Sequence, residues 1–269
     1  MVVCALGDLT LDVSVRLRAS LAAGGDTEAQ IHLAAGGQGA NVAAWAASLG
    51  AEARFIGKRG DDRAGRLVTS ELEGKGVRVL GPQDGRNGVV CVLVSPNGER
   101  SMAPDRGAAA ELRAEEVEPA WLDGCDHLFV SGYALFQEPA RGAAARAIAV
   151  ARERGAAVSV DLASWSSLQA AGADTIRELL AELRPDVVFT NEDEERALGG
   201  RLPGAAWILK RGRRGCSFDG DERGAVPVEL VVDSTGAGDA LAAGWIVGGS
   251  ELALEAAARC VQHQGAMPQ

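Results

Sequence analysis

Four consecutive residues near the end of the chain, Gly236, Ala237, Gly238 and Asp239, have types and an order that could support chemistry. They follow an apolar run at 228–232 (VELVV), which predicts a strand, and we expect a turn at the small residues and a helix from Asp239 onward. Such a turn directs free backbone N–H groups beyond the helix start, where they and the helix dipole stabilise developing negative charge. An aspartate beside this anion hole is placed to accept a proton from an attacking hydroxyl. A simple helix cap is an equally good interpretation of Asp239 from this segment alone.

A second glycine-rich turn lies at residues 36–39 (GGQG), ahead of a run that has Asn41 among its first residues. Val42, Ala46 and Leu49 give this run the apolar stripe of a helix. Asn41 could therefore reach a ligand hydroxyl or cap the helix, and the residue type alone favours the cap.

Neither of the two simple nucleotide-binding patterns is present. Residues 236–241 lack the third glycine of G-x-G-x-x-G, and no part of the chain matches G-x-x-x-x-G-K-[ST]. A dehydrogenase and a P-loop NTPase are therefore disfavoured.

Short β-branched or apolar runs recur along the chain and predict strands. They lie at 2–6, 53–57, 127–132, 157–162, 186–190 and 206–210. The segments between them, such as 139–154 and 174–183, carry the apolar spacing of surface helices. This alternation predicts an α/β fold with a mostly parallel sheet and helices on both of its faces.

Two segments, 10–35 and 86–104, instead alternate apolar with polar residues, and Pro96-Asn97-Gly98 in the second predicts a hairpin turn. We expect antiparallel strands that form a small sheet projecting from the main body. This sheet could be a lid over a cleft, a plain extension of the main sheet or a dimer surface. No boundary between independent domains is visible, so residues 1–269 are expected to form a single domain.

The bulk composition excludes some partners. The 269 residues carry a formal net charge of −10, which argues against nucleic acid because that partner requires clustered Lys and Arg. An anionic small molecule is not excluded, since backbone N–H groups and local cations can bind a phosphate. The chain has no run of about 18 apolar residues and no leader-like start, so we expect a cytoplasmic protein without membrane contact.

The two glycine-rich segments together resemble a known family. Residues 36–66 (GGQGANVAAWAASLGAEARFIGKRGDDRAGR) and 233–245 (DSTGAGDALAAGW) look like the two signature regions of the ribokinase-like (PfkB-type) carbohydrate kinases. The likeness extends to GDLTLD at 7–12, to 87–108 and to VVFTNEDE at 187–194. It implies a three-layer α/β/α sandwich with a mostly parallel central sheet and a small β-sheet lid that closes over a sugar.

The resemblance also assigns roles to the residues around the anion hole. Asp239 would be the general base, and Gly236, Ala237 and Gly238 would stabilise the γ-phosphoryl group of ATP as it moves. The chain would then be an ATP-dependent phosphotransferase acting on a hydroxyl, most simply a primary alcohol, of a sugar or sugar-like molecule.

The resemblance further implies that Asp12, Gly37 and Asn41 contact the sugar. Carboxylate and amide groups suit this role, since they pair well with vicinal hydroxyls. Asp12 could instead be a strand-end residue that faces solvent. Arg106, after the second lid segment, could meet an anionic group of the substrate or form an ordinary surface salt bridge.

The nucleotide would be contacted by Lys210, Gly212 and Gly238, although a lysine on the surface is an equal alternative for Lys210. Asn191 and Glu194 match the family's N-x-x-E element, which helps to organise Mg²⁺ and its waters.

Asp233 and Thr235 match positions that bind a monovalent cation, such as K⁺, in several members.

Some alternatives stay open. The stretch after the second signature, 257–269, is short for the region that packs against adenine, so the nucleotide preference is open. A nucleoside kinase of the same family would need a base-stacking pocket, and the two lid segments contain no aromatic residue, although Phe129, Tyr133, Phe136 and Trp165 lie elsewhere. A non-catalytic sugar- or nucleotide-binding regulator is a further alternative. A homodimer could form through the exposed edge of the lid sheet.

Overall fold

The main sheet of the molecule has nine strands, and the computed structural model describes residues 1–269. The strands are β1 (Val2–Leu6), β4 (Glu52–Ile56), β5 (Val77–Leu80), β8 (His127–Ser131), β9 (Ala157–Asp161), β10 (Val187–Asn191), β11 (Ala206–Lys210), β12 (Cys216–Phe218) and β13 (Asp221–Arg223). Their order is β13-β12-β11-β10-β9-β8-β1-β4-β5. All neighbours from β11 to β5 pair in parallel, and β12 and β13 add an antiparallel edge. The predicted, mostly parallel sheet is confirmed.

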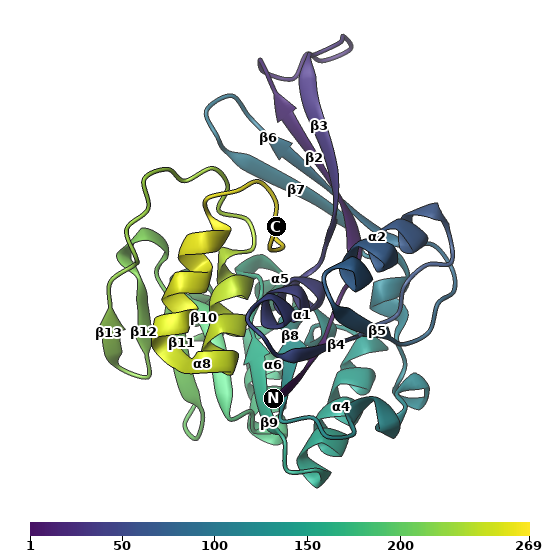
Figure 1. Ribbon diagram of the computed structural model, residues 1–269, viewed down its shortest axis with the longest axis vertical. Helices are drawn as coiled ribbons and strands as arrows, with labels where there is room; N and C mark the ends of the chain where they lie inside the picture. The colour runs from purple at the N-terminus through teal and green to yellow at the C-terminus, as the bar shows by residue number, and fades with distance from the viewer.

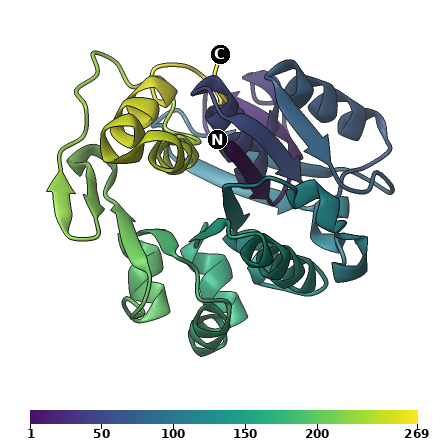
Figure 2. The same ribbon diagram turned by 60° about the horizontal axis from the view of Figure 1, so that its bottom comes forward.

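Helices cover both faces of this sheet (Figure 2), because parallel strands need crossover connections. One hydrophobic core joins the sheet to α1 (Gln38–Ser48), α2 (Arg63–Gly74) and α8 (Ala237–Cys260). The other core joins it to α3 (Gly132–Leu135), α4 (Ala140–Glu153), α5 (Trp165–Ala171), α6 (Ala173–Leu183) and α7 (Glu192–Leu198). Four short 3₁₀ helices complete the chain: η1 (Gly107–Glu111), η2 (Ala114–Glu116), η3 (Pro119–Leu122) and η4 (Gly212–Arg214).

Strand β1 shows why the two cores are separate. Val3 and Ala5 belong to the core on the α1 side, whereas Cys4 and Leu6 belong to the core on the α4 side. Successive side chains of a strand point to opposite faces, so a strand buried on both faces reads as a continuous apolar run. The predicted three-layer α/β/α arrangement follows from this pattern.

A second sheet projects from the main body (Figure 1). It has four strands in the order β3 (Ala29–Gly36), β2 (Thr10–Leu17), β6 (Gly88–Val94) and β7 (Arg100–Asp105), and we call it the small sheet. Each of the two segments predicted to form antiparallel strands forms one antiparallel pair, β2 with β3 and β6 with β7. The two pairs join through β2 and β6, which are parallel. The turn between β6 and β7 is closed by the N–H of Gly98, which donates to the carbonyl of Ser95 at 2.8 Å.

Two local predictions are wrong. Residues 228–232 form no strand: they connect β13 to α8 as an irregular segment in which the side chain of Leu230 is 67% exposed. Their apolar residues find no neighbouring strand, and the backbone N–H of Val232 donates instead to the carbonyl of Val261. Helix α8 begins at Ala237, two residues before the predicted start at Asp239, because Gly236 takes a left-handed conformation and is the N-cap of the helix.

Three strands have no counterpart in the sequence prediction: β5, β12 and β13. Each is only three or four residues long; β5 and β12 interrupt their apolar residues with a polar one, and β13 has no apolar residue, so a periodic signal is weak or missing. No helix combines the length and apolarity needed to cross a membrane.

Candidate active site

A cleft of about 890 Å³ lies between the small sheet and the carboxyl-terminal ends of the main strands. In an open α/β sheet, this edge is where ligands bind. Seven of the residues to which the resemblance assigned a catalytic, substrate or cation role line the cleft: Asp12, Gly37, Asn41, Arg106, Thr235, Gly236 and Asp239. The fold thus brings both glycine-rich segments to one site, although they are nearly 200 residues apart.

The turn before α8 leaves backbone donors free. Gly236 has a φ of 78°, and a Cβ on it would lie 2.6 Å from Ala266, so only glycine fits this position. The N–H of Ala240 donates to the carbonyl of Gly236, but the N–H groups of Gly238 and Asp239 donate to no acceptor within the protein. They are the unsatisfied donors of a helix N-terminus and can receive an anion.

Asp239 lies in the first turn of α8, and its carboxylate is not a helix cap. Its Oδ2 accepts a hydrogen bond of 2.7 Å from Nδ2 of Asn41, which joins the first turns of α1 and α8. Burial raises the pKa of Asp239 to about 7, against the opposing effects of this hydrogen bond and of the charge of Lys210. A carboxylate with this pKa is suited to accept a proton at neutral pH.

Asn41 also has an unused acceptor. Its Oδ1 is buried and has no hydrogen-bond partner, and its side chain does not cap α1. A buried carbonyl oxygen without a partner is costly unless a ligand supplies a donor. The helix-cap interpretation of Asn41 is therefore wrong, and its side chain is free to meet a hydroxyl in the cleft.

Asp12, on β2, is half-buried and lines the cleft. Two glycines, Gly36 and Gly37, leave space for the Asp12 side chain and for the backbone of Asp8. The hydroxyl of Thr10 donates to Oδ1 of Asp12 at 2.9 Å, and burial raises the pKa of Asp12 to about 6. A Cβ on Gly36 would lie 2.2 Å from the Asp12 carboxylate, and one on Gly37 would lie 2.3 Å from the carbonyl oxygen of Asp8. Asp12 therefore faces the cleft rather than open solvent.

Arg106 is held by a buried partner. Its Nε and Nη2 donate to the two carboxylate oxygens of Asp8 at 2.7 and 2.8 Å, and its guanidinium lies 5.9 Å from the ring centre of Tyr133. Burial would lower the pKa of Arg106, but the Asp8 carboxylate holds it above its ordinary value. Arg106 thus forms a salt bridge, but the pair lines the cleft and not the outer surface, and contact with an anionic group of the substrate stays a prediction. Asp8 was not singled out from the sequence, although it stands in GDLTLD directly after a strand.

Lys210 lies behind the anion hole and not on the surface. Its Nζ is 2.6 Å from Oδ2 of Asp161, and it lies 3.4 Å from the position that a Cβ on Gly238 would occupy. Burial disfavours the charged ammonium, yet the carboxylate of Asp161 raises the pKa of Lys210 above its ordinary value. Sequence reasoning missed Asp161, which could have been found because it ends a predicted strand at the same edge of the sheet.

Asn191 and Glu194 hold one another at the start of α7. Oδ1 of Asn191 accepts the N–H groups of Asp193 and Glu194, while the Glu194 carboxylate accepts the backbone N–H and the side-chain amide of Asn191 at 2.9 and 2.7 Å. Glu194 is only 2% exposed, and burial raises its pKa. Both oxygens of Glu194 and Oδ1 of Asn191 already accept hydrogen bonds, so direct ligation of Mg²⁺ does not fit, and contact with waters of the ion stays a prediction. No cluster of three or more His, Cys, Asp or Glu forms a metal site.

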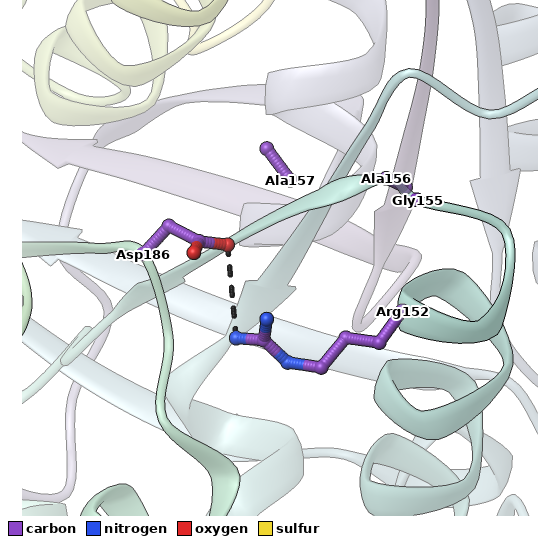
Figure 3. Close-up of a pocket in the computed structure, with 5 residues that line it drawn as sticks. All are labelled: Arg152, Gly155, Ala156, Ala157 and Asp186. Atoms are coloured by element: carbon purple, nitrogen blue, oxygen red, sulfur yellow. Dashed lines mark ion pairs between the residues drawn. The ribbon is translucent and has the colours of Figure 1, made fainter.

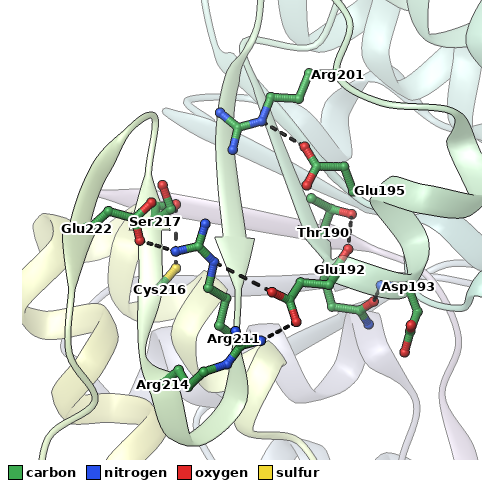
Figure 4. A network of polar contacts seen from close by, with 11 residues as sticks. Thr190, Glu192, Asp193, Glu195, Arg201, Arg211, Arg214, Cys216, Ser217 and Glu222 are labelled. Carbon is green, nitrogen blue, oxygen red and sulfur yellow. Dashed lines mark hydrogen bonds and ion pairs between the residues drawn. The ribbon is translucent and has the colours of Figure 1, made fainter.

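Gly212 lies in η4, between two charged residues, Arg211 and Arg214, whose side chains Figure 4 shows. It has a φ of 56° and begins η4, with open space where a Cβ would be. Arg211 and Arg214 both pair with Glu192, and Arg211 also pairs with Glu222. These ion pairs fix the loop beside the start of α7, whereas Gly212 itself does not line the cleft.

A second, smaller pocket of about 370 Å³ lies at the amino-terminal ends of β9 and β10, and Figure 3 shows the residues that line it. It is lined by Arg152, Gly155, Ala156, Ala157 and Asp186. Asp186 accepts the backbone N–H of Val158 at 2.7 Å and lies 3.6 Å from Arg152. Its polar groups thus bind each other and the backbone, so the pocket carries no candidate chemistry.

Asp233 and Thr235 do not fit the monovalent-cation site that the resemblance implied. Oδ1 of Asp233 accepts the backbone N–H and the hydroxyl of Thr235 at 2.9 and 2.7 Å, and it lies 2.9 Å from Nη2 of Arg100. Oδ1 is thus surrounded by donors, and Oδ2 accepts the backbone N–H of Gly265 at 3.3 Å, whereas a cation needs free acceptor oxygens.

Comparisons with known proteins identify the family and the fold. The family model described as pfkB family carbohydrate kinase matches residues 2–267. Fructokinase-1 of Oryza sativa subsp. japonica is 31% identical over 77% of this chain and 71% of its own, and the ATP-dependent ribose-1-phosphate kinase of Halopiger xanaduensis is 30% identical over 96% and 90%. The crystal structure of adenosine kinase from Sinorhizobium meliloti superposes with a TM-score of 0.86 at 25% identity, over 99% of this chain and 95% of that one. The fold is thus ribokinase-like, and the chain belongs to the pfkB family of carbohydrate kinases.

Proposed function

We propose that the protein transfers the γ-phosphoryl group of ATP to a hydroxyl of a sugar, with Asp239 as the general base. The observation that carries this proposal is the position of Asp239, a carboxylate with a pKa of about 7, in the wall of a cleft beside a helix N-terminus with free N–H groups. Membership of a carbohydrate kinase family supports the substrate class.

The acceptor end of the cleft is polar. Asp12 and the free Oδ1 of Asn41 are available to accept hydrogen bonds from hydroxyl groups of the sugar. Asp239 then takes the proton of the attacking hydroxyl, while Asn41 holds the carboxylate in place through its amide. Substrate hydroxyls held beside both groups would place the attacking oxygen for in-line transfer.

The backbone of residues 236–238 stabilises the phosphoryl group as charge develops on it. The charge of Lys210, close behind Gly238, adds to the positive potential of this turn. Mg²⁺, brought with the phosphates of ATP, supplies further neutralisation of charge, and Asn191 and Glu194 are available as acceptors for its waters. We expect the small sheet to act as the lid that excludes water.

A nucleoside kinase is the second candidate, because Tyr133 and Phe136 both line the cleft and their rings make an edge-on contact at 6.2 Å. Of the other two aromatic candidates, Phe129 is buried in the core, and Trp165 does not line the cleft. The exposed side chains of Ile31 and Leu33 on β3 are compatible with the predicted homodimer, which stays a prediction.

The proposal is tested by following ADP release with Mg-ATP against pentoses, hexoses, ketoses, deoxy-keto acids, sugar phosphates and nucleosides. Turnover that requires a sugar and yields one phosphorylated product supports it. Turnover only with nucleosides favours the second candidate, and ligand-induced stabilisation without turnover on any acceptor would indicate a binding protein instead.

A further inference from the structure

Arg100 connects the small sheet to the loop that forms the anion hole. It begins β7, next to the turn at residues 95–99, and Figure 1 shows this hairpin on the same side of the molecule as α8. Its Nη1 donates to the hydroxyl of Thr235 at 2.6 Å, and its Nη2 donates to the hydroxyl of Ser234 at 3.2 Å and lies 2.9 Å from Oδ1 of Asp233. One side chain of the small sheet thus contacts all three residues that precede Gly236.

The other attachments of the small sheet lie elsewhere. Strands β2 and β3 pack against α2, where the carboxylate of Glu71 accepts the N–H of Ala35 at 2.7 Å. Arg106, just after β7, pairs with Asp8 at the end of β1. The contacts of Arg100 therefore join the small sheet to a different part of the main body, the segment before α8, and Arg100 itself lines the cleft.

Asp233 needs a positive partner because of its position. Burial would raise its pKa, but the hydrogen bonds from Thr235 and Gly265 and the charge of Arg100 hold the pKa below its ordinary value. An ionised carboxylate this near the anion hole would disfavour negative charge on an incoming phosphoryl group. A bound cation could neutralise it, but the oxygen that would hold a cation already faces the guanidinium of Arg100.

We propose that Arg100 is a positioning residue that takes the place of a monovalent cation at Asp233. Because Arg100 belongs to the small sheet, these contacts couple the position of that sheet over the cleft to the conformation of the anion-hole loop. This inference rests on the proposed kinase function, and it assigns to the lid a part in catalysis beyond the exclusion of water.

The test compares the wild type with Arg100→Gln, with the conservative Arg100→Lys and with the matched control Arg86→Gln. Arg86 also belongs to the small sheet region but pairs with Asp105 in solvent, with both side chains 60% exposed. Arg100→Gln is expected to lower kcat about tenfold or more with little change in the KM for the acceptor, Arg100→Lys to recover part of that loss, and Arg86→Gln to behave as the wild type. Wild-type turnover in Arg100→Gln would overturn the proposal.

A second measurement does not depend on turnover. Tm is measured for the wild type in KCl and in tetramethylammonium chloride at equal ionic strength, because the bulky organic cation cannot enter an oxygen-lined site. The proposal predicts the same Tm in both salts. A wild-type Tm that is higher in KCl would show K⁺ at a specific site and overturn it. If no acceptor is phosphorylated, the kinase proposal fails. The comparison of Tm in the two salts still decides whether Arg100 or a bound cation neutralises the charge of Asp233.

Discussion

Replacement of Asn41 by alanine should shift the pH dependence of catalysis in a defined direction. The variant loses the 2.7 Å hydrogen bond to Asp239, one of the interactions that keep the pKa of that carboxyl from rising above about 7. A hydrogen bond to a charged group contributes about 1.5–3 kcal/mol, which corresponds to a rise of about one to two in pKa. The pKa of Asp239 in the variant would then be about 8 to 9, and its ionised fraction at pH 7 would fall from about one half to between roughly one tenth and one hundredth.

The assay is kcat measured at saturating acceptor between pH 5.5 and 9.5. Because the ionised carboxylate is the base, activity rises with pH through the pKa, and the rising limb of Asn41→Ala should lie at higher pH than that of the wild type. Activity should recover near pH 9. Thr10→Val is the control, because it removes a hydrogen bond in the same cleft whose acceptor is Asp12 and not Asp239. A limb that stays in place in Asn41→Ala, with kcat lowered equally at every pH, would refute the reasoning.

Three further predictions concern stability. Burial raises the pKa of Asp239 from 3.8 to about 7, so the stability that its protonation provides is present at acid pH and lost as the pH rises through 7. Asp239→Asn should therefore be more stable than the wild type at pH 8, by at most about 4 kcal/mol in the free energy of unfolding. Calorimetry should show a higher Tm for the variant at pH 8 and a smaller difference at pH 5. Gly236→Ala should lower the free energy of unfolding in urea by about 1–3 kcal/mol and remove most of the activity, because the added Cβ would meet Ala266. Gly249→Ala is the control and should keep its activity, since Gly249 has a similar φ of 80° but open space around it. Equal losses in the two variants would contradict the steric argument. Lys210→Met leaves Asp161 buried without its partner and should cost about 3–5 kcal/mol, part of which the additional change Asp161→Leu should restore; additive losses in the double variant would show that the pair is not coupled.

The parts of the fold that could be predicted are those with a repeated signal. The alternation of buried strands and amphipathic helices predicts the main sheet, because each parallel strand is apolar on both faces and each helix on one. The strand expected at 228–232 shows the limit of this reasoning. Its residues are as apolar as those of β10, but strand formation requires a neighbouring edge, and antiparallel β12 and β13 already complete that end of the sheet.

The site could be predicted where a residue stands in a distinctive motif. Asp239 and Asn41 were found through the glycines beside them, and the structure joins them by a hydrogen bond. Asp161 and Arg100 were not, because neither stands in such a motif. The only signal for Asp161 is its position at the end of a predicted strand, and Arg100 is a charged residue on an exposed hairpin. Their roles depend on partners 49 and 135 residues away, which only the folded chain brings together.

The central claim is that Asp239 takes the proton of the acceptor hydroxyl. The most direct measurement is kcat of Asp239→Asn against the wild type on the acceptor identified from the panel, with ATP binding followed by calorimetry in both proteins. The account predicts that kcat falls by about 10²-fold or more while the affinity for ATP is retained. Turnover close to that of the wild type would contradict it, because the amide of asparagine cannot accept that proton.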